Sequence, residues 1–349
     1  MKINLKDYNL QELEQLFLEY GEKPFRARQV ADWIFKKGAS SFEEMTNLPR
    51  DLRIRLEKEA RPGTLAILKK QVSSRGDTVK FLLGLEDGQA VESVFMEHYY
   101  GYTACISTQV GCRMGCAVCA STLGGLVRNL SPGEMYEQVL VLQRESGKRI
   151  GHIVLMGTGE PLDNYDNTIK FIENINAVYG LNIGYRHITL STCGIVPRIR
   201  QLAGEGFPIT LAVSLHAADD GLRNRLMPVN RKYPLDMLME ACRYYSGKTG
   251  RRITFEYALL AGVNDSAGDA VKLVRLLKRI PCHVNLIPYN AVDERGFGRS
   301  APGVVQSFRR QVEQAGIEVT VRRELGTDID AACGQLRRRS VAERPGISG

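Results

Sequence analysis

Three cysteines stand close together in the chain, at a spacing that suits one bulky inorganic cofactor. The segment GCRMGCAVCAS places Cys112, Cys116 and Cys119 in a C-x3-C-x2-C pattern, with glycines at 111 and 115. Thiolates on one short loop can bind an iron–sulfur cluster, and cubane clusters usually take four cysteines. Three ligands would leave one iron open to a small molecule. Glycine allows the tight backbone bends that such a loop needs, so the pattern favours a 4Fe-4S cluster.

A structural zinc site is the main alternative for this loop. Zinc knuckles and ribbons favour C-x2-C pairs and need a fourth ligand to close the tetrahedron. Outside this loop, Cys193, Cys242, Cys282 and Cys333 are scattered singly, so they form no second pair. We interpret Cys193, Cys242 and Cys282 as packing residues, because they lie in strand or helix contexts.

Cys333 does not fit a packing role. It lies in DIDAACGQLRRRS, between small residues and with polar and charged residues on both sides. A buried structural thiol would have apolar neighbours at helix or strand spacing. The sequence therefore indicates a chemical role for this thiol.

Apolar, β-prone runs alternate with helical patterns from about residue 102 onward. Repeated strand–helix units with continuously apolar strands indicate a parallel sheet. Six or seven units are too few to close an eight-stranded barrel, so we predict an α/β fold of the partial (β/α)6-type barrel. A Rossmann-like sheet is the weaker alternative, because the first strand–helix turn lacks a G-x-G-x-x-G fingerprint. The expected strands are residues 103–108, 152–157, 186–192, 209–216, 253–260, 283–290 and 317–324.

Polar residues follow most of these strands. The cysteine loop comes after the first strand, GTGEPLDN after the second, STCG after the third, SLHA after the fourth and YN after the sixth. The carboxyl ends of parallel strands form one rim, which is where barrel enzymes place their active sites. We therefore expect a single site at this rim.

Four regions are expected along the chain. Residues 1–61 form a helical accessory domain, and residues 62–101 form a small β extension that leads into the main domain. Residues 102–335 form the barrel with a catalytic C-terminal segment, and residues 336–349 form a basic tail that we expect to be flexible.

The composition is typical of a globular protein of 349 residues, with 44% hydrophobic and 25% charged residues. No apolar run approaches the roughly 18 residues of a membrane helix, and the start has no signal-peptide core, so we expect a cytoplasmic protein. A net charge of +8 suggests a polyanionic partner such as nucleic acid, with a solvated basic surface as the alternative. Basic groups at 222–232, 248–252, 272–279 and 336–340 would contact phosphate or form such a surface.

The motifs together resemble the RlmN type of radical S-adenosylmethionine RNA methyltransferases. The similarity covers nearly the whole chain, from GEKPFRARQVADWIF to AACGQL, and includes ACISTQVGCRMGCAVCAS, MGTGEPLDN, HITLSTCGIVP, LAVSLHAADDGLRNRLMPVNRKYPL and VNLIPYN. The resemblance implies methylation of adenosine carbon-2 in 23S rRNA, in the peptidyl transferase region, and at the adenosine 3′ to the anticodon in some tRNAs. It also implies two S-adenosylmethionine molecules per turnover, a reductant such as flavodoxin or ferredoxin, and action as a monomer.

The resemblance also assigns roles to residues of the rim. Cys112, Cys116 and Cys119 would bind the cluster. S-adenosylmethionine would be held by Gly159, Glu160, Ser191, Ser214, Leu215, His216 and Asn290. Taken singly, these residues have simpler explanations: GTGEP could be a plain turn, Ser191 or Asn290 a helix cap, and His216 a structural histidine.

Three more residues match the family's methyl-transfer chemistry. Cys333 would carry the methyl group as S-methylcysteine, and Cys105 would attack its sulfur, giving a transient disulfide. Glu92 would accept the carbon-2 proton, whereas without the resemblance it would be interpreted as a solvated surface carboxylate.

Two positions depart from the family pattern. An aromatic residue commonly precedes the third cluster cysteine, where this chain has Val118, and the usual MGMGE reads MGTGE, with Thr158. Both changes leave the ligand positions intact.

Two alternative functions are retained. The related Cfr type methylates carbon-8 of the same rRNA adenosine and shares the cluster loop and both mechanistic cysteines, although CASTLGGL and GEPLDNY favour the RlmN type. A zinc-stabilised RNA-binding protein without catalysis would leave the polar rim without a purpose.

Overall fold

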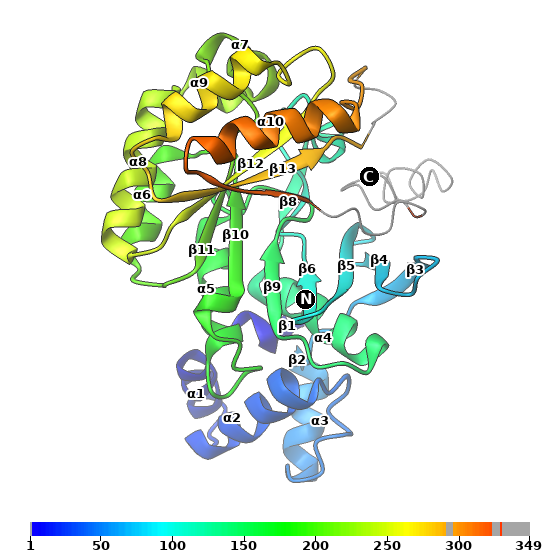
Figure 1. The fold of residues 1–349 in the computed structure, drawn as a ribbon. Coiled ribbons are helices and arrows are strands. Elements are labelled where there is room, and N and C mark those ends of the chain that lie inside the picture. Colours follow the sequence, from blue (N-terminus) through cyan, green and yellow to red (C-terminus); the bar gives the residue numbers. More distant parts are fainter. Residues whose placement is uncertain (1, 291–295, 323–328, 330–349) are drawn as a thin grey trace.

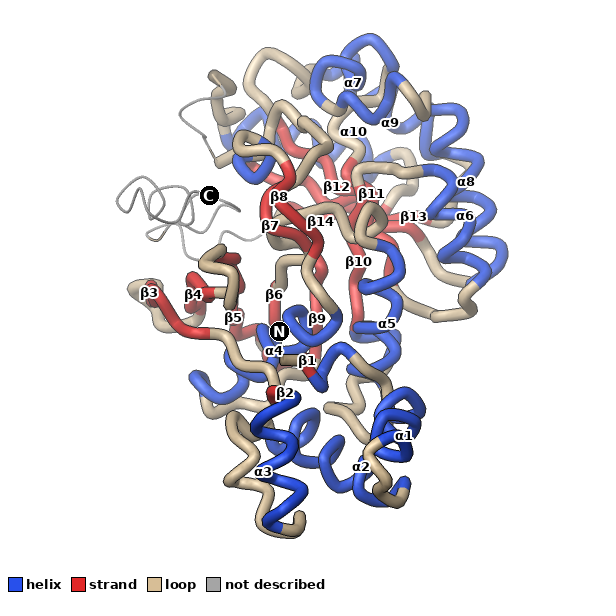
Figure 2. Tube along the Cα trace, turned by 180° about the vertical axis from the view of Figure 1, so that it is seen from behind, coloured by secondary structure: helices blue, strands red, loops and turns tan. Residues whose placement is uncertain are grey.

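A single ten-stranded sheet forms the centre of the molecule (Figures 1 and 2). The computed structural model describes residues 2–290, 296–322 and 329. Within these residues the strand order is β14-β13-β12-β11-β10-β9-β6-β5-β4-β3. No helix in this described part is long and apolar enough to cross a membrane.

Seven neighbouring strands of this sheet run parallel. They are β6 (Gly101–Cys105), β9 (His152–Leu155), β10 (Ile188–Thr192), β11 (Thr210–Ser214), β12 (Ile253–Leu259), β13 (Cys282–Pro288) and β14 (Glu318–Val321). Helices lie in each of the six connections between them: α4 (Pro132–Ser146), α5 (Tyr165–Asn176), α6 (Val196–Gly204), α7 (Asp220–Leu226) with α8 (Leu235–Thr249), α9 (Ala267–Leu277) and α10 (Pro302–Gln314). This arrangement confirms the predicted partial barrel, and within the described residues β3 and β14 remain as open edges.

The antiparallel strands before the barrel belong to the same sheet. β3 (Ala66–Val72), β4 (Thr78–Gly84) and β5 (Ala90–His98) pair in succession and join the parallel part through β6. The small β extension expected from the sequence therefore continues the main sheet.

Three helical segments precede the sheet, as the sequence pattern predicts. α1 (Leu10–Glu19) begins with a capping box between Asn9 and Glu12. α2 (Pro24–Ala31) runs into a π-helical segment (η2, Asp32–Lys37) that ends at Gly38, which has a left-handed φ of 67°. α3 (Arg50–Glu59) starts directly after Pro49. Proline disfavours helical backbone at the residue before it, so the helix cannot extend back through this position.

Short elements complete the fold. They are β1 (Ile3–Asn4), β2 (Ala60–Arg61), β7 (Gln109–Gly111), β8 (Leu126–Asn129), and the 3-10 turns η1 (Leu5–Asp7), η3 (Ala120–Thr122), η4 (Tyr185–His187) and η5 (Pro228–Arg231).

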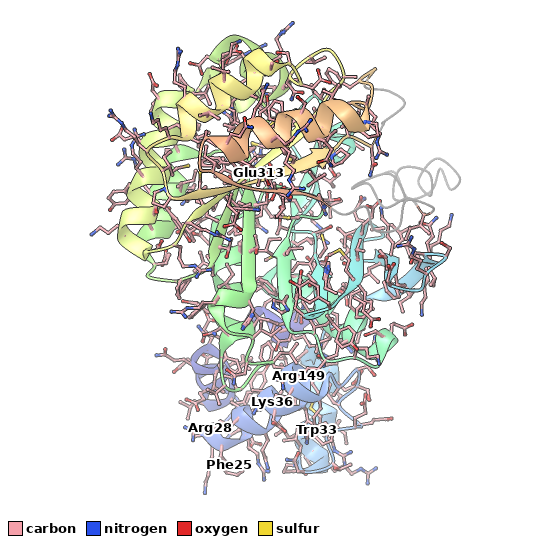
Figure 3. The ribbon with its side chains drawn as sticks, in the orientation of Figure 1. Phe25, Arg28, Trp33, Lys36, Arg149 and Glu313 are labelled. Carbon is pink, nitrogen blue, oxygen red and sulfur yellow. The ribbon has the colours of Figure 1, made fainter. Side chains whose placement is uncertain are left out.

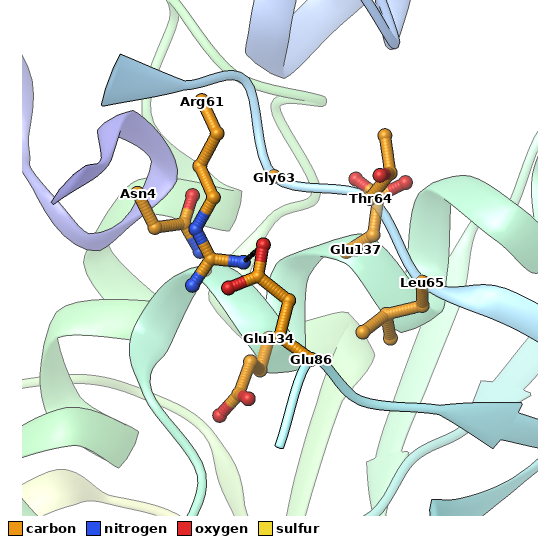
Figure 4. Close-up of a pocket in the computed structure, with 9 residues that line it drawn as sticks. Asn4, Arg61, Gly63, Thr64, Leu65, Glu86, Glu134 and Glu137 are labelled. Carbon is orange, nitrogen blue, oxygen red and sulfur yellow. Dashed lines mark ion pairs between the residues drawn. The ribbon is translucent and has the colours of Figure 1, made fainter. Parts of the chain in front are cut away.

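The helical N-terminal segment contacts α4 through buried polar side chains. The Lys6 ammonium forms an ion pair with Glu137 and donates to the Gly63 carbonyl at 2.7 Å. The Tyr136 hydroxyl donates to the Phe35 carbonyl at 3.0 Å. A small pocket next to these contacts is lined by Asn4, Arg61, Gly63, Thr64, Leu65, Glu86, Gly133, Glu134 and Glu137 (Figure 4). None of the predicted site residues lines this pocket.

Candidate active site

The register of the sheet places polar side chains on one of its two faces. Alternate residues of a strand face the same side, and directly paired residues share a side. Cys105 pairs with Val94 and Val154, while Ser214 pairs with Glu256, which pairs with Asn285. Following these pairs through the sheet gives one polar face that carries Lys80, Glu92, Thr103, Cys105, Thr189, Ser191, Ser214, Thr254, Glu256, His283, Asn285 and Thr320.

The opposite face is apolar and buried, with Phe81, Phe95, Ala104, Ile153, Leu190, Leu211, Phe255 and Val284 among its residues. An open parallel sheet covered by helices on its apolar face leaves the polar face available for a site. The predicted site residues Glu92, Cys105, Ser191 and Ser214 all lie on that polar face.

The cysteine loop is shaped by the β7–β8 hairpin, which depends on glycine. Gly111 has φ +79°, and a Cβ at this position would lie 2.0 Å from the Gly125 carbonyl oxygen. The Cys112 amide donates to the same oxygen at 2.8 Å. Gly115, between the first two cysteines, has φ +70°. Both glycines therefore adopt the left-handed backbone expected for a tight loop.

The environment of the three thiols fits a cluster. Cys112 and Cys116 are buried, and burial raises the pKa of Cys112 to about 12 and that of Cys116 still further. Each of these two thiols also lies within electrostatic range of the other cysteines of the loop. Buried thiolates require nearby positive charge, and cluster iron would supply it.

Apolar side chains surround the loop. Cys116 packs in a cluster with Ala120, Cys193, Ala217, Leu222, Leu226, Met227, Leu260 and Tyr289, and Cys119 and Val118 border the same cluster. Such a setting limits the access of water to a cofactor. In the described part of the chain, no three His, Cys, Asp or Glu side chains gather closely enough to hold one metal ion. A cubane cluster does not require this, because each cysteine binds a different iron.

The GTGEP segment follows β9 and lies against the start of the cysteine loop. Gly159 has φ +114°, and a Cβ there would lie 2.7 Å from the backbone nitrogen of Gln109. The Glu160 carboxylate accepts the Cys193 amide at 2.7 Å and the Leu162 amide at 3.0 Å. Burial raises the pKa of Glu160, while these amide donors oppose the rise. Glu160 thus links the loops after β9 and β10, and each of its oxygens has one backbone donor.

Thr158, one of the two departures from the family pattern, is buried in this segment. Its backbone carbonyl accepts the amides of Thr108 and Gln109 at 2.9 and 3.2 Å. Its hydroxyl has no hydrogen-bond partner among the described residues.

His216, after β11, adopts an unusual backbone conformation. Its φ is +57°, in the left-handed region that non-glycine residues seldom occupy. Its Nδ1 accepts the Ala258 amide at 3.0 Å, and its carbonyl accepts the Asn264 side-chain amide at 2.8 Å. Burial lowers the pKa of His216 to about 3. The ring is therefore neutral at physiological pH, with its hydrogen on Nε2. Strained backbone of this kind concentrates at functional sites.

The remaining predicted S-adenosylmethionine residues lie along the same rim. Ser191 and Ser214 are half-buried near the ends of β10 and β11, and Leu215 is fully buried. Asn290 follows β13 and is exposed, next to the buried Tyr289. The rim therefore brings these residues to one edge of the sheet.

Glu92 is not the solvated carboxylate that its sequence context alone suggested. It is 3% exposed, and its carboxylate lies 2.9 Å from the Lys80 ammonium, which is itself buried. Cys105 is also buried, and it lies on the adjacent strand on the same face, beside Val94. Glu92 and Cys105 thus lie on one face of neighbouring strands, two positions apart in register, whereas Cys333 and the basic tail lie outside the described residues.

Sequence reasoning missed two further features of the polar face. Lys80 pairs with Glu92, and Glu256 accepts the Asn285 amide at 2.9 Å, with the Thr320 hydroxyl donating to Asn285 at 3.1 Å. Burial raises the pKa of Glu256. The signal was present as single polar residues at alternate positions in TVKFLLG, ITFEYAL and CHVNLIP.

Basic groups that were considered for RNA contact differ widely in exposure. Arg225, Arg231 and Lys232 are exposed, but Arg223 of the same segment is fully buried and cannot reach phosphate. On the accessory helices, Phe25, Arg28, Trp33 and Lys36 lie at one end of the molecule (Figure 3).

Comparisons with known proteins agree with this architecture. Residues 3–61 match the family model described as the ribosomal RNA large subunit methyltransferase N-terminal domain, and residues 106–274 match that of the radical SAM superfamily. A crystal structure of a radical SAM methyltransferase from Sphaerobacter thermophilus superposes with a TM-score of 0.92 at 44% identity, covering 95% of this chain and 98% of that chain.

Sequence relatives extend over nearly the full length. A probable dual-specificity RNA methyltransferase RlmN from Desulforamulus reducens is 61% identical over 338 residues, which cover 97% of each chain. One from Pelotomaculum thermopropionicum is 62% identical over 339 residues, or 97% of this chain and 92% of the relative. The chain therefore belongs to the RlmN family of dual-specificity RNA methyltransferases, within the radical SAM superfamily.

Proposed function

We propose that this enzyme methylates carbon-2 of an adenosine in the peptidyl transferase region of 23S rRNA and of the adenosine 3′ to the anticodon in some tRNAs, through an S-methylcysteine at Cys333. The observation that carries the proposal is that the buried Cys105 and Glu92 lie on the same polar face of neighbouring strands, two positions apart in register. Family membership supports RNA methylation by radical chemistry, and this pair of side chains supports the cysteine-based route.

Cys112, Cys116 and Cys119 would hold a 4Fe-4S cluster, since their loop is buried, glycine-bent and surrounded by apolar side chains. When bound, the cluster would supply the electron that cleaves S-adenosylmethionine. Val118 and Cys119 border the apolar cluster and would help to exclude water from the site.

Rim residues would bind S-adenosylmethionine. The backbone at Gly159 can approach a ligand closely because no Cβ stands in the way. Glu160 would orient that segment and can accept a further donor from the ligand. Ser191, Ser214, Leu215, His216 and Asn290 would contact the ribose, adenine and amino-acid portions, and the Nε2–H of His216 is a fixed hydrogen-bond donor.

Three side chains would carry out the methyl transfer, using two S-adenosylmethionine molecules per turnover. The Cys333 thiolate first takes a methyl group from the sulfonium of one of them. A radical from the second S-adenosylmethionine would remove one hydrogen atom from the S-methyl group, and the remaining methylene carbon would bond to carbon-2 of the adenine. Glu92 accepts the carbon-2 proton, and the electron that the adduct releases would return to the bound cluster. The Cys105 thiolate then attacks the Cys333 sulfur and forms the S–S bond, while the electron pair of the broken sulfur–carbon bond stays on the methylene carbon, which takes up a proton to become the new methyl group.

Lys80 gives Glu92 a defined position for this task. Its ammonium lies 2.9 Å from the carboxylate and keeps it on the polar face.

The intact mass of the Cys333 peptide tests the proposal. Protein purified without oxygen, with its iron and sulfide counted, should carry one methyl group on Cys333 after incubation with S-adenosylmethionine. The methyl group should be absent from Cys333→Ala and from a variant with Cys112, Cys116 and Cys119 replaced by alanine. A full cluster with Cys333 unmethylated would contradict the carrier mechanism.

Mapping the methylated carbon in rRNA from complemented cells separates carbon-2 from the carbon-8 chemistry of the Cfr type. We also propose that the enzyme acts in the cytoplasm as a monomer and receives electrons from a flavodoxin or ferredoxin.

A further inference from the structure

Arg223 is a fully buried arginine at the rim, on the short helix α7. Its guanidinium donates four hydrogen bonds. Nη2 donates to the Cys193 carbonyl at 2.8 Å and to the Ser214 carbonyl at 3.2 Å, and Nε donates to the Leu215 carbonyl at 3.2 Å. Arg223 therefore ties together the ends of β10 and β11 and the loops that follow them, a region that carries four of the seven predicted S-adenosylmethionine residues.

The positive charge of this arginine lacks a direct carboxylate partner. The fourth bond, from Nη1, goes to the neutral Asn230 side chain at 2.8 Å, so none of its four acceptors in the described part of the chain is charged. The Asp220 carboxylate is reached only through Asn230, which donates to it at 2.8 Å. Burying an arginine without an anion is unfavourable, and burial lowers the pKa of Arg223 accordingly.

The cysteine loop can supply a negative charge within electrostatic range of Arg223. Burial raises the pKa of the Cys116 thiol, and Arg223 is the cation that opposes this rise. Helix α7 also contacts the loop directly, because the Ala117 amide donates to the Leu226 carbonyl at 2.8 Å. Leu222 and Leu226 pack with Cys116 in the same apolar cluster. The charge of Arg223 therefore acts on the loop through a medium that screens it weakly.

We propose that Arg223 is a positioning residue with two separable effects: its charge makes the cluster easier to reduce, and its forked donors hold the β10 and β11 loops in place for S-adenosylmethionine. The inference rests on the proposed function, because it requires a cluster on the cysteine loop. Reduction adds one negative charge to the cluster, and a fixed buried cation stabilises that charge.

Two substitutions separate the effects. Arg223→Gln removes the positive charge and most of the hydrogen-bond donors. Arg223→Lys keeps the charge but loses the planar guanidinium, which donates to several carbonyls at once. Arg225→Gln is the matched control, since Arg225 lies on the same helix and is exposed. The measurements are the midpoint potential, from a redox titration followed by electron paramagnetic resonance, and the dissociation constant of S-adenosylmethionine. Iron and sulfide are counted for every variant.

Arg223→Gln should shift the midpoint potential to more negative values, and Arg223→Lys and Arg225→Gln should leave it at the wild-type value. The dissociation constant should rise roughly tenfold or more in both Arg223 variants, as expected for lost hydrogen bonds to a charged group, and stay unchanged in Arg225→Gln. A purely structural role would weaken binding in the Arg223 variants and leave the potential of Arg223→Gln unchanged, which would overturn the inference.

A carboxylate exchange tests the charge even if Arg223→Gln does not fold. The double variant Asp220→Asn with Asn230→Asp keeps the net charge and moves one carboxylate from the far side of the network to Nη1 of Arg223. The potential should again become more negative, and an unchanged potential in this variant would refute the charge effect. A wild-type protein that binds no iron would instead refute the proposed function, and the inference with it.

Discussion

Lys80 and Glu92 face each other within the sheet, where neither side chain is solvated. The ion pair of Lys70 and Glu145 has a similar separation, 3.3 Å, but both of those side chains are substantially exposed. The difference matters because removing one partner of a buried pair leaves an unpaired charge in a poorly solvated site. An exposed charge is instead hydrated once its partner is lost.

Lys80→Met is therefore expected to lower the free energy of unfolding by about 3 kcal/mol, a typical cost of breaking a buried pair. Lys70→Met, the matched control, should lower it by less than about 1 kcal/mol. Urea denaturation followed by circular dichroism measures both values. Equal effects of the two substitutions would mean that the Lys80–Glu92 pair is solvated in solution.

The buried His216 is expected to make the folded protein less stable as the pH falls. Its pKa is lowered to about 3 in the folded protein, from an ordinary value of about 6.5. The unfolded state binds the proton more tightly, so stability falls as the pH drops below about 6.5 toward 3. From pH 7 to pH 5 this group should account for about 2 kcal/mol of the decrease.

His216→Asn should remove that part of the decrease. Asparagine tolerates the left-handed backbone, and its side-chain oxygen can accept the Ala258 amide. The measurement is the free energy of unfolding of the metal-free protein at pH 7 and pH 5. The prediction is wrong if His216→Asn loses as much stability on acidification as the wild type.

At the scale of elements, the β7–β8 hairpin determines whether the cysteine loop can form. Its first strand ends at Gly111, whose backbone is left-handed and in close contact with Gly125. Gly124, in the same hairpin, has open space around its Cα and an ordinary φ. The two glycines differ in structural role although they lie close together.

Gly111→Ala should abolish cluster binding, because the added Cβ would clash with the Gly125 carbonyl. Alanine would also have to adopt the left-handed backbone, which costs about 1–3 kcal/mol. Gly124→Ala should bind as much iron and sulfide as the wild-type protein. Iron and sulfide analysis after anaerobic reconstitution gives the comparison. Full iron content in Gly111→Ala would show that the loop can form without this turn.

The sequence predicts the elements of this fold well and their fine positions less well. The strands were predicted from apolar runs, but the structure ends most of them earlier, at Cys105, Leu155 and Ser214, because the polar residues beyond are needed in rim loops. Repeated strand–helix patterns determine the topology, and the cysteine spacing determines where the candidate cluster loop begins.

Single charges were harder to place from the sequence. Arg223 lies among several arginines in LRNRLMPVNRK, for which the sequence predicts either phosphate contact or a solvated basic surface, yet it is buried. Its burial depends on carbonyl groups of loops that are distant in the chain. Glu92 raised the same difficulty, since only the pairing of β4 with β5 brings Lys80 close enough to stabilise it inside the sheet.

Within the described residues, one large hydrophobic cluster extends from the N-terminal helices into the barrel. Leu13, Phe17 and Ile34 of the N-terminal helices belong to the same buried cluster as Leu211 and Phe255 of the barrel. The buried pair of Lys6 and Glu137 lies at the junction, and burial raises the pKa of Glu137 and lowers that of Lys6. The accessory helices and the barrel are therefore expected to unfold together.

Glu137→Gln should lower the stability of the whole molecule by about 3 kcal/mol, because Lys6 would remain buried without its anion. Calorimetry should show one transition at a lower temperature, and hydrogen exchange should show reduced protection in α1–α3 as well as in α4. Glu145→Gln, at an exposed position of the same helix, is the control. Two separate transitions would contradict a shared core.

The apolar surround of the cysteine loop has a consequence for biosynthesis. It is completed by Leu260 and Tyr289, which follow Cys119 by 141 and 170 positions in the chain. At the usual speed of translation, the ribosome needs on the order of ten to thirty seconds to reach Tyr289 after it has made Cys119. During this interval the nascent chain presents three thiols without their apolar cover. Oxidative damage to this enzyme should therefore fall mainly on chains still being made, and mature molecules should be the more resistant pool.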